Sequence, residues 1–334
     1  METLIIRMGS SSTTIYREGE GIVLKEASLV AVSGDGKEQV VKAVGDRAKY
    51  MQGRTTGDTH VVSPIYEGVI NDTELATIML EFFLNKIYGK SLFRPKICAI
   101  LSVPIGISLS ERKAFEKVCY NAKILDVELI PNVFCGALGM NLDIHTPRGV
   151  MVVNIGGTTT NVAVLGLNNI LSGACICLGG KNIDVAIENE IKNKFKMKIG
   201  DGSAEKIKIE VGSLYVNDSL QLDVEGVDTE TKGSRVESLY SRDVINIFKY
   251  YIDKIALSIE SVLSACTPDI INDIKKDGVY VYGGGSKITG LEYYLKQRLG
   301  FDVNIVDENG DIEIFGGEKL LDNPKQLEVI LKNI

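Results

Sequence analysis

A strand–turn–strand unit whose turn is rich in glycine and hydroxyl side chains occurs twice along the chain, and this repeat constrains the fold most. In the first copy, an apolar strand over residues 4–8 leads into a turn over 9–14 and then a returning strand. In the second copy, a strand over 150–154 leads into a turn over 156–160 and returns over 161–166. Such a repeat predicts two related α/β domains with a cleft between them.

Length and composition agree with this prediction. The 334 residues suffice for about two domains of ordinary size. Hydrophobic residues at 45% and charged residues at 24% are typical of a globular protein and argue against a disordered chain. The formal charge of −7 disfavours a general nucleic-acid binder, which needs a basic face. No nucleic-acid partner is therefore expected.

The termini and the cysteines bear on the compartment. No apolar run approaches the roughly 20 residues of a membrane-spanning helix, and the first residues lack the basic and apolar segments of a signal peptide. Six cysteines in a chain of this length are too sparse for a disulfide framework, and with two histidines no zinc site is expected. We therefore expect a cytoplasmic protein.

Hydrophobic periodicity predicts helices and strands between the repeated units. A helix is expected over 72–88, with Asp72 as its N-cap, and a long helix over 241–266, with Ser241 as its cap. The polar segment 220–235 is expected at a sheet edge. Further helices are expected over 110–122, 133–140, 182–198 and 291–299, and strands over 22–24, 29–32, 39–44, 97–103, 127–130 and 278–282.

Three glycine-containing turns are candidates for binding phosphate. Glycine lets a backbone approach a ligand closely and turn its amides inward, and neighbouring hydroxyls add hydrogen-bond donors. The third turn precedes a helix, whose N-terminus favours anions. The alternative is that each turn only joins two strands. The three sets are Gly9, Ser10, Ser11 and Ser12; Gly156, Gly157, Thr158 and Thr159; and Gly283, Gly284, Gly285 and Ser286.

With these turns in place, the chain resembles the MreB-type bacterial actins, of the actin and heat-shock-chaperone ATPase superfamily. The resemblance covers nearly the whole chain, and its order makes it specific although each motif alone is modest. Its most specific segment is 204–213, with the sequence AEKIKIEVGS. The other matching segments are 19–24, 43–45, 53–55, 67–70, 103–107, 111–112, 155–160, 283–285 and 290–291.

The resemblance implies an actin-like α/β fold with two RNase-H-like domains, each carrying a small subdomain, around a nucleotide cleft. Domain I would comprise 1–142 plus 312–334, with its small subdomain at about 32–65. Domain II would comprise 143–311, with its small subdomain at about 181–245. ATP would lie between the domains, its phosphates on the first two turns and its sugar and base near the third.

Two charged residues of the small subdomain are implied in the same site. By resemblance, Glu205 and Lys208 would flank the base or the ribose. Three positions apart on an expected helix, they would otherwise form an exposed charge pair.

The resemblance fails at the positions that carry the family's catalytic chemistry. Arg7 stands where an aspartate is usual before the first turn, and Asn154 where an aspartate precedes the second. Asn161 replaces the glutamate after the threonines, and Asn132 stands in the segment where the family has Glu-Glu-Pro. Magnesium prefers carboxylate, water and phosphate oxygens, and hydrolysis needs a group that polarises water. Arginine instead binds phosphate directly.

These departures lead to the hypothesis of a pseudo-ATPase that keeps the actin-like fold and hydrolyses ATP slowly or not at all. Asn132, at the degenerate catalytic position, would orient water but act as a poor base. ATP is the implied ligand, and the loss of acidic groups leaves its dependence on magnesium open. The alternative is that carboxylates enter the cleft from elsewhere in the chain.

The loop around Leu92 and Phe93 is a candidate membrane contact. These apolar residues lie between lysine and arginine side chains, and the family uses a short apolar loop there. Two inserted apolar side chains would contribute about 3–5 kcal/mol, and a filament would multiply this by avidity. The alternative is that both side chains pack inside the protein.

The resemblance finally implies self-association into filaments at the inner face of the cytoplasmic membrane, with cell-wall synthesis proteins as partners. The chain would then set cell shape by positioning cell-wall synthesis. The second hypothesis is a nucleotide-independent scaffold or regulator that copolymerises with, or caps, an active MreB paralogue. A sugar kinase is disfavoured by the missing carboxylate base, and a chaperone ATPase by the absence of a substrate domain.

Overall fold

The computed structural model describes residues 2–34, 39–55, 57–89, 95–306 and 310–334. Its strands are β1 Glu2–Met8, β2 Ser12–Arg17, β3 Gly21–Ala27, β4 Val30–Ser33, β5 Val40–Val44, β6 Thr59–Val62, β7 Ile65–Tyr66, β8 Val69–Ile70, β9 Ile97–Val103, β10 Ile124–Pro131, β11 Val150–Ile155, β12 Thr160–Gly166, β13 Asn169–Ile176, β14 Met197–Lys198, β15 Gln221–Asp228, β16 Ser234–Tyr240, β17 Val279–Tyr282 and β18 Val303–Ile305. The helices are α1 Asp46–Met51, α2 Thr73–Tyr88, α3 Leu109–Asn121, α4 Asn132–Gly139, α5 Gly180–Phe195, α6 Asp201–Val211, α7 Ser241–Ser264, α8 Pro268–Asp277, the 3₁₀ turn η2 Gly284–Lys287, α9 Leu291–Leu299, α10 Ile312–Asp322 and α11 Pro324–Asn333.

The first half of the chain builds a five-stranded sheet in the order β10-β9-β1-β2-β3. Successive residues of a strand face opposite sides, and β1 follows this alternation. Leu4 and Ile6 pack with Phe83 of α2 and Phe115 of α3, while Ile5 contacts Ile314 of α10. Position 7 therefore lies on the face that α10 covers.

The second half builds a matching five-stranded sheet in the order β13-β12-β11-β17-β18. Met151 and Val153 of β11 pack with apolar side chains of α5 and α7. Val152 belongs instead to a buried cluster with residues of α4, α10 and α11. Asn154, two residues further on, shares this second face and so points toward α4 and α10.

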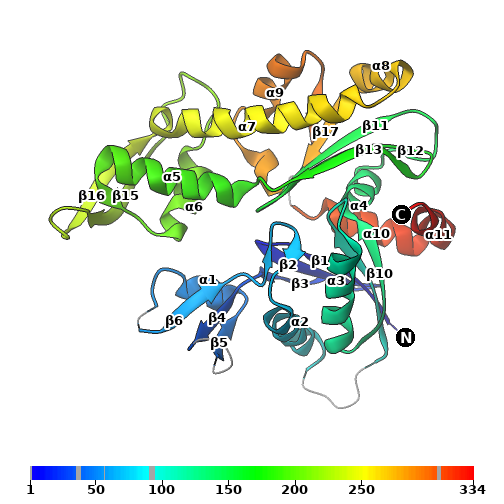
Figure 1. Cartoon of the computed structure of the whole chain (residues 1–334), viewed down its shortest axis with the longest axis horizontal. Coiled ribbons are helices and arrows are strands. Elements are labelled where there is room, and N and C mark those ends of the chain that lie inside the picture. The colour runs from blue at the N-terminus through cyan, green and yellow to red at the C-terminus, as the bar shows by residue number, and fades with distance from the viewer. Residues whose placement is uncertain (1, 35–38, 56, 90–94, 307–309) are drawn as a thin grey trace.

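Helices α4 and α10 cross closely between the two sheets (Figure 1). A Cβ atom on Gly316 would lie 1.7 Å from the carbonyl oxygen of Cys135, and one on Gly139 would lie 2.1 Å from that of Ile312. Only glycine permits this approach. The crossing fixes the start of α10 at the ends of strands from both sheets.

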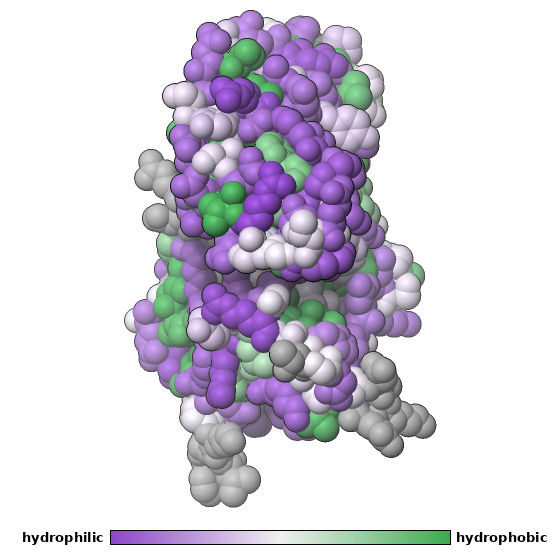
Figure 2. All heavy atoms as spheres, turned by 90° about the vertical axis from the view of Figure 1, so that its left-hand side faces the viewer, coloured by the Kyte–Doolittle hydropathy of each residue, from purple (hydrophilic) through white to green (hydrophobic). Residues whose placement is uncertain are grey.

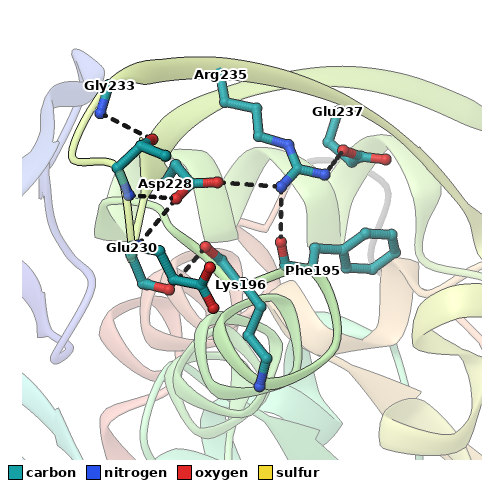
Figure 3. A network of polar contacts seen from close by, with 9 residues as sticks. Phe195, Lys196, Asp228, Glu230, Gly233, Arg235 and Glu237 are labelled. Atoms are coloured by element: carbon teal, nitrogen blue, oxygen red, sulfur yellow. Dashed lines mark hydrogen bonds and ion pairs between the residues drawn. The ribbon is translucent and has the colours of Figure 1, made fainter.

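Each large sheet carries a smaller layer, and both lie on the left of Figure 1. The first layer is the sheet β5-β4-β6 with α1, and the second is β14-β15-β16 with α6. Figure 3 shows how Arg235 orders the second layer: it donates to Asp228, Glu237 and the carbonyl of Phe195 over 2.7 to 3.3 Å. This network joins the hairpin β15–β16 to the end of α5.

Most of the expected elements are present, and the N-cap at Asp72 is confirmed by its hydrogen bond from the amide of Leu75. The expected cap at Ser241 is wrong. Tyr240 is the N-cap residue, and its amide donates to Asp243. Ser241 is the first residue of α7, and its hydroxyl donates to the carbonyl of Asp218 and, among the described residues, caps no amide of the helix. The sequence did not predict α1, α8, α10 or α11.

Candidate functional site

The first two glycine turns face each other, as expected. The Thr158 hydroxyl donates to the Ser10 hydroxyl over 2.8 Å, and both side chains are buried. Within each turn a glycine amide donates to a carbonyl three residues on: Gly9 to Ser12 over 3.0 Å, and Gly156 to Thr159 over 2.8 Å. These tight turns bring backbone amides and hydroxyls of both sheets to one place.

Gly157 makes this contact possible. A Cβ atom there would lie 2.2 Å from the Ser11 hydroxyl and 2.9 Å from that of Ser10. A larger residue would force the two turns apart, so the sequence at this position is matched to the opposite turn.

The N-terminus of α5 adds a cation that sequence analysis missed. The amides of Gly180 and Lys181 donate to the carbonyls of Gly156 and Gly157 over 3.0 and 2.8 Å. The Lys181 ammonium donates to the carbonyl of Ser10 over 2.8 Å, so this lysine bridges the two turns. Burial lowers the pKa of Lys181, against a raising effect of the carboxylate of Glu205. The Gly-Gly pair before Lys181 is the local signal that could have indicated it.

The third turn packs onto the strand that carries the second. Gly283 has φ 91°, and a Cβ atom there would lie 2.4 Å from Oδ1 of Asn154. The Ser286 hydroxyl donates to the carbonyl of Gly283 over 2.7 Å, and a Cβ on Gly285 would overlap the side chain of Ile155. A Cβ on Gly284 would meet nothing within 4 Å. All three predicted turns are thus brought together.

Glu205 connects the two small layers across the gap between them. It forms an ion pair of 2.9 Å with Lys49 of α1, and Gln52 of α1 donates to Asp201 over 2.8 Å. Figure 2 looks onto this side and shows a furrow between the two lobes of the molecule. The alternative considered for these residues, an exposed charge pair of Glu205 with Lys208, is not the arrangement observed.

Lys208 lies on the inner side of α6. Its ammonium forms an ion pair of 2.8 Å with Asp184 and donates to the carbonyl of Gly180 over 3.3 Å. Lys208 therefore supports the N-terminus of α5 beside the second turn, and both ends of this contact are largely shielded from solvent.

Arg7 lies beneath the first turn, among the buried and half-buried polar residues that we call the floor of the cleft: Arg7, Asn132, Asn154, Asn161 and Glu313. It is a residue of β1, and its guanidinium donates to the hydroxyls of Ser12 and Thr14 over 3.2 Å each. Its Nε atom is buried without a hydrogen-bond partner. The guanidinium therefore faces the hydroxyl turn that was predicted to bind phosphate.

The asparagines that replace family acids also lie in the floor. Asn161 is fully buried; its Oδ1 accepts from the amide of Ile105 over 3.1 Å and its Nδ2 has no partner. Asn132 begins α4, its carbonyl accepts from the hydroxyl of Tyr282, and its buried Oδ1 has no partner. Buried polar atoms are normally hydrogen-bonded, so these orphaned atoms mark a place that a polar ligand fits.

A carboxylate that sequence analysis missed also enters the floor. Glu313 of α10 is 5% exposed. Its Oε2 accepts from the hydroxyl of Ser102 over 2.7 Å, and its Oε1 accepts from Nδ2 of Asn154 over 2.8 Å. An acidic residue inside the apolar run Ile312-Glu313-Ile314-Phe315 was the available signal. The floor therefore contains a carboxylate, although the strand positions have lost theirs.

The oxygen ligands available in the floor decide whether a magnesium ion fits there. Among the residues that the structure describes, no group of three or more His, Cys, Asp and Glu side chains is placed to hold a metal. Magnesium, however, commonly keeps several waters and is bound through one or two carboxylates plus substrate phosphates. The Glu313 carboxylate supplies one such carboxylate in this floor, so a hydrated ion held mainly by water and phosphate oxygens fits here.

The predicted membrane residues Leu92 and Phe93 lie outside the described residues. No helix within the described ranges is long and apolar enough to cross a bilayer.

Comparisons with known proteins agree with this architecture. The MreB/Mbl protein family matches residues 1–329. The chain is 33% identical over 322 residues to the cell shape-determining protein MreB of Escherichia coli K12, covering 96% of this chain and 93% of that protein. It is 34% identical over 326 residues to the cell shape-determining protein Mbl of Bacillus cereus, covering 96% of both.

Solved structures give the same fold. MreB5 of Spiroplasma citri bound to ADP superposes with a TM-score of 0.90 at 26% identity, covering 98% of both chains. The MamK double helical filament has a TM-score of 0.79 at 19% identity, covering 96% of this chain and 99% of that one, which supports the fold alone. The actin-like α/β fold expected from the sequence is confirmed, and the chain belongs to the MreB/Mbl family of actin-like proteins.

Proposed function

We propose that this chain binds a nucleotide between its glycine turns and assembles into filaments of the cell-shape-determining type. The single observation that carries the proposal is the meeting of the turns at Ser10 and Thr158, with the cations of Arg7 and Lys181 beside them. Amides, hydroxyls and two cations from both sheets converge there, which is the chemistry that polyphosphate requires. The solved relative MreB5 is described with ADP and with AMPPNP, and MamK as a double helical filament.

Hydrolysis in this cleft is slow or absent, so the protein acts as a pseudo-ATPase. Asn132 and Asn161 carry amides where a base or a metal-orienting acid would be needed. An amide accepts a hydrogen bond from water but does not remove its proton at neutral pH. A bound nucleotide would then serve to join the two domains, and turnover would not drive the filament.

The test is nucleotide binding and turnover by the purified chain, with magnesium and with EDTA, alongside a pelleting assay. We expect saturable ATP binding, turnover well below that of the Escherichia coli relative measured in parallel, and pelleting that increases with ATP. Turnover equal to that of the relative would overturn the pseudo-ATPase. Absence of binding would overturn the nucleotide site.

The second candidate is a nucleotide-independent scaffold or regulator that copolymerises with, or caps, an active MreB paralogue. The observation that favours it is that side chains alone already join the two halves, through Ser10 with Thr158 and Lys49 with Glu205. Pelleting that is unchanged by ATP, together with altered pelleting of an active paralogue, would favour this candidate over the first.

The filaments would lie at the inner face of the cytoplasmic membrane, where they would position cell-wall synthesis proteins. Leu92 and Phe93, between basic residues, are the proposed membrane contact. Replacing both with serine should abolish co-sedimentation with anionic liposomes while leaving pelleting intact. Replacing the exposed Leu125 and Leu167 with serine is the matched control. Liposome binding that survives the first replacement would refute the loop's role.

A further inference from the structure

We propose that Glu313 takes the place of the cleft's missing carboxylates and is the group through which a divalent cation strengthens nucleotide binding. The inference rests on the proposed function, because it concerns the same cleft. Glu313 lies on α10, outside the three glycine turns and outside the strand positions where the family has its acids.

The position of Glu313 supports this role. Its carboxylate joins Ser102, near the end of β9 in the first sheet, to Asn154, near the end of β11 in the second. Ser102 pairs directly with Arg7 in the parallel register of β9 and β1. Asn154 precedes the second glycine turn by two residues. The carboxylate therefore lies at the junction of the two sheets, among the strand ends that carry the phosphate-binding turns.

The hydrogen bond between Glu313 and Asn154 places a carboxylate of α10 beside the strand position where the resemblance implies an acid. The resemblance places an acid at position 154, and here that position carries an amide. The amide donates to a carboxylate supplied by α10. In this chain the acid of the pair therefore lies on the helix α10 and its neutral partner lies on the strand β11.

Electrostatics then couples this carboxylate to the ligand. Glu313 is buried, so water screens the charge of its carboxylate poorly. A polyphosphate brought to the turns places further negative charge near it, and like charges repel strongly where water is excluded. Arg7 and Lys181 offset part of the phosphate charge. A divalent cation between the phosphate and the carboxylate removes the remaining repulsion, so nucleotide binds more tightly with magnesium than without it.

The experiment measures the ATP dissociation constant in magnesium and in EDTA, using a fluorescent ATP analogue, for the full chain. Wild type should bind about tenfold more tightly with magnesium, which corresponds to 1.4 kcal/mol of linkage. Glu313→Gln, which keeps the shape and removes the charge, should bind more tightly in EDTA and lose most of the magnesium effect. Asp322→Asn, an exposed acid at the end of the same helix, is the matched control and should keep the wild-type ratio.

A double variant that moves the carboxylate from the helix to the strand gives a sharper test. The double variant Glu313→Gln with Asn154→Asp returns the carboxylate to the strand and reverses the direction of the hydrogen bond. It should recover the magnesium effect. Asn154→Asp alone sets two carboxylates against each other and should weaken binding in EDTA further. Glu313→Leu, similar in size, provides a second measurement should the glutamine variant fold poorly.

The outcomes separate this inference from the proposed function. Nucleotide binding in which Glu313→Gln and Glu313→Leu keep the wild-type magnesium ratio would overturn the role of Glu313 and leave the nucleotide site standing. A wild-type ratio of one would overturn it equally. Absence of nucleotide binding in both buffers would overturn the proposed function and this inference together.

Discussion

The hydroxyl of Thr158 donates a 2.8 Å hydrogen bond to the hydroxyl of Ser10, and this bond joins turns that belong to two different sheets. Thr158 also accepts from the amide of Glu67 over 3.0 Å, so one side chain of the second half contacts two segments of the first. The two halves are therefore held at the turns by direct contact. A ligand that binds between the turns must exchange these contacts for its own.

Gly157→Ala tests the contact between the turns. The added Cβ would overlap the Ser11 hydroxyl, and overpacking of this kind costs about 1–3 kcal/mol. We expect the melting temperature of the ligand-free protein to fall by several degrees, by about 2–4 °C per kcal/mol. Gly202→Ala, where a Cβ meets nothing within 4 Å, is the control and should not lower it. Equal melting temperatures for the two variants would contradict the contact.

Arg7→Met tests the cation in the floor. Its guanidinium faces the hydroxyls of Ser12 and Thr14, and a charged hydrogen bond to phosphate contributes about 1.5–3 kcal/mol. The ATP affinity measured in EDTA should fall by about tenfold or more, because no metal then offsets the phosphate charge. Arg47→Met, an exposed arginine of α1, should leave the affinity unchanged. Tighter binding by Arg7→Met would mean that the arginine blocks the site.

The ion pair between Lys49 and Glu205 should slow release of the nucleotide, because it bridges the two small layers. Partly exposed pairs contribute at most about 1 kcal/mol, so Lys49→Glu should speed dissociation by no more than about fivefold. The exchange Lys49→Glu with Glu205→Lys should restore the slow rate. Stopped-flow displacement of a fluorescent nucleotide measures this. Failure of the exchange to restore the rate would indicate that Glu205 contacts the ligand itself.

The turns that the sequence predicted beside this cleft are those with local signals. Glycine and hydroxyl side chains between apolar strands predict a turn wherever they occur, so the three turns needed no tertiary information. Glu313 and Lys181 gave weaker local signals, an acid inside an apolar run and a lysine after a Gly-Gly pair. Each reaches the cleft only because a distant element is packed against it: α10 through its glycine contacts with α4, and α5 through its hydrogen bonds to the second turn.

The same distinction applies to the carboxylate in the floor of the cleft. Counting the acids lost at Arg7, Asn132, Asn154 and Asn161 left open whether carboxylates enter from elsewhere in the chain. A count along single sequence positions could not identify Glu313 as such a residue. The pairing of Glu205 with Lys49 was likewise beyond a sequence pattern, since the two residues belong to different layers. Long-range polar contacts, together with the helices α1, α8, α10 and α11, are therefore what the sequence left undetermined here.

The acidic pair of Glu188 and Asp201 predicts a pH dependence of stability. Burial, together with the charge of Asp201 and a hydrogen bond to it, raises the pKa of Glu188 from 4.5 to about 7. Asp184 adds to this rise and Lys198 opposes it. Between these two values the folded chain holds a proton that the unfolded chain has released, so stability decreases as the pH rises through about 7. The melting temperature of the wild type should thus fall between pH 5 and pH 8, and by more than that of a variant in which residue 188 cannot ionise.

Glu188→Gln isolates this contribution, because the amide keeps a donor toward Asp201 at every pH. Its melting temperature should exceed that of wild type at pH 8 and match it near pH 5, so the difference between the two curves follows the titration of Glu188. Glu190→Gln, on the same helix, should run parallel to wild type. A wild-type curve that runs parallel to that of Glu188→Gln from pH 5 to pH 8 would contradict a protonated Glu188 in the fold.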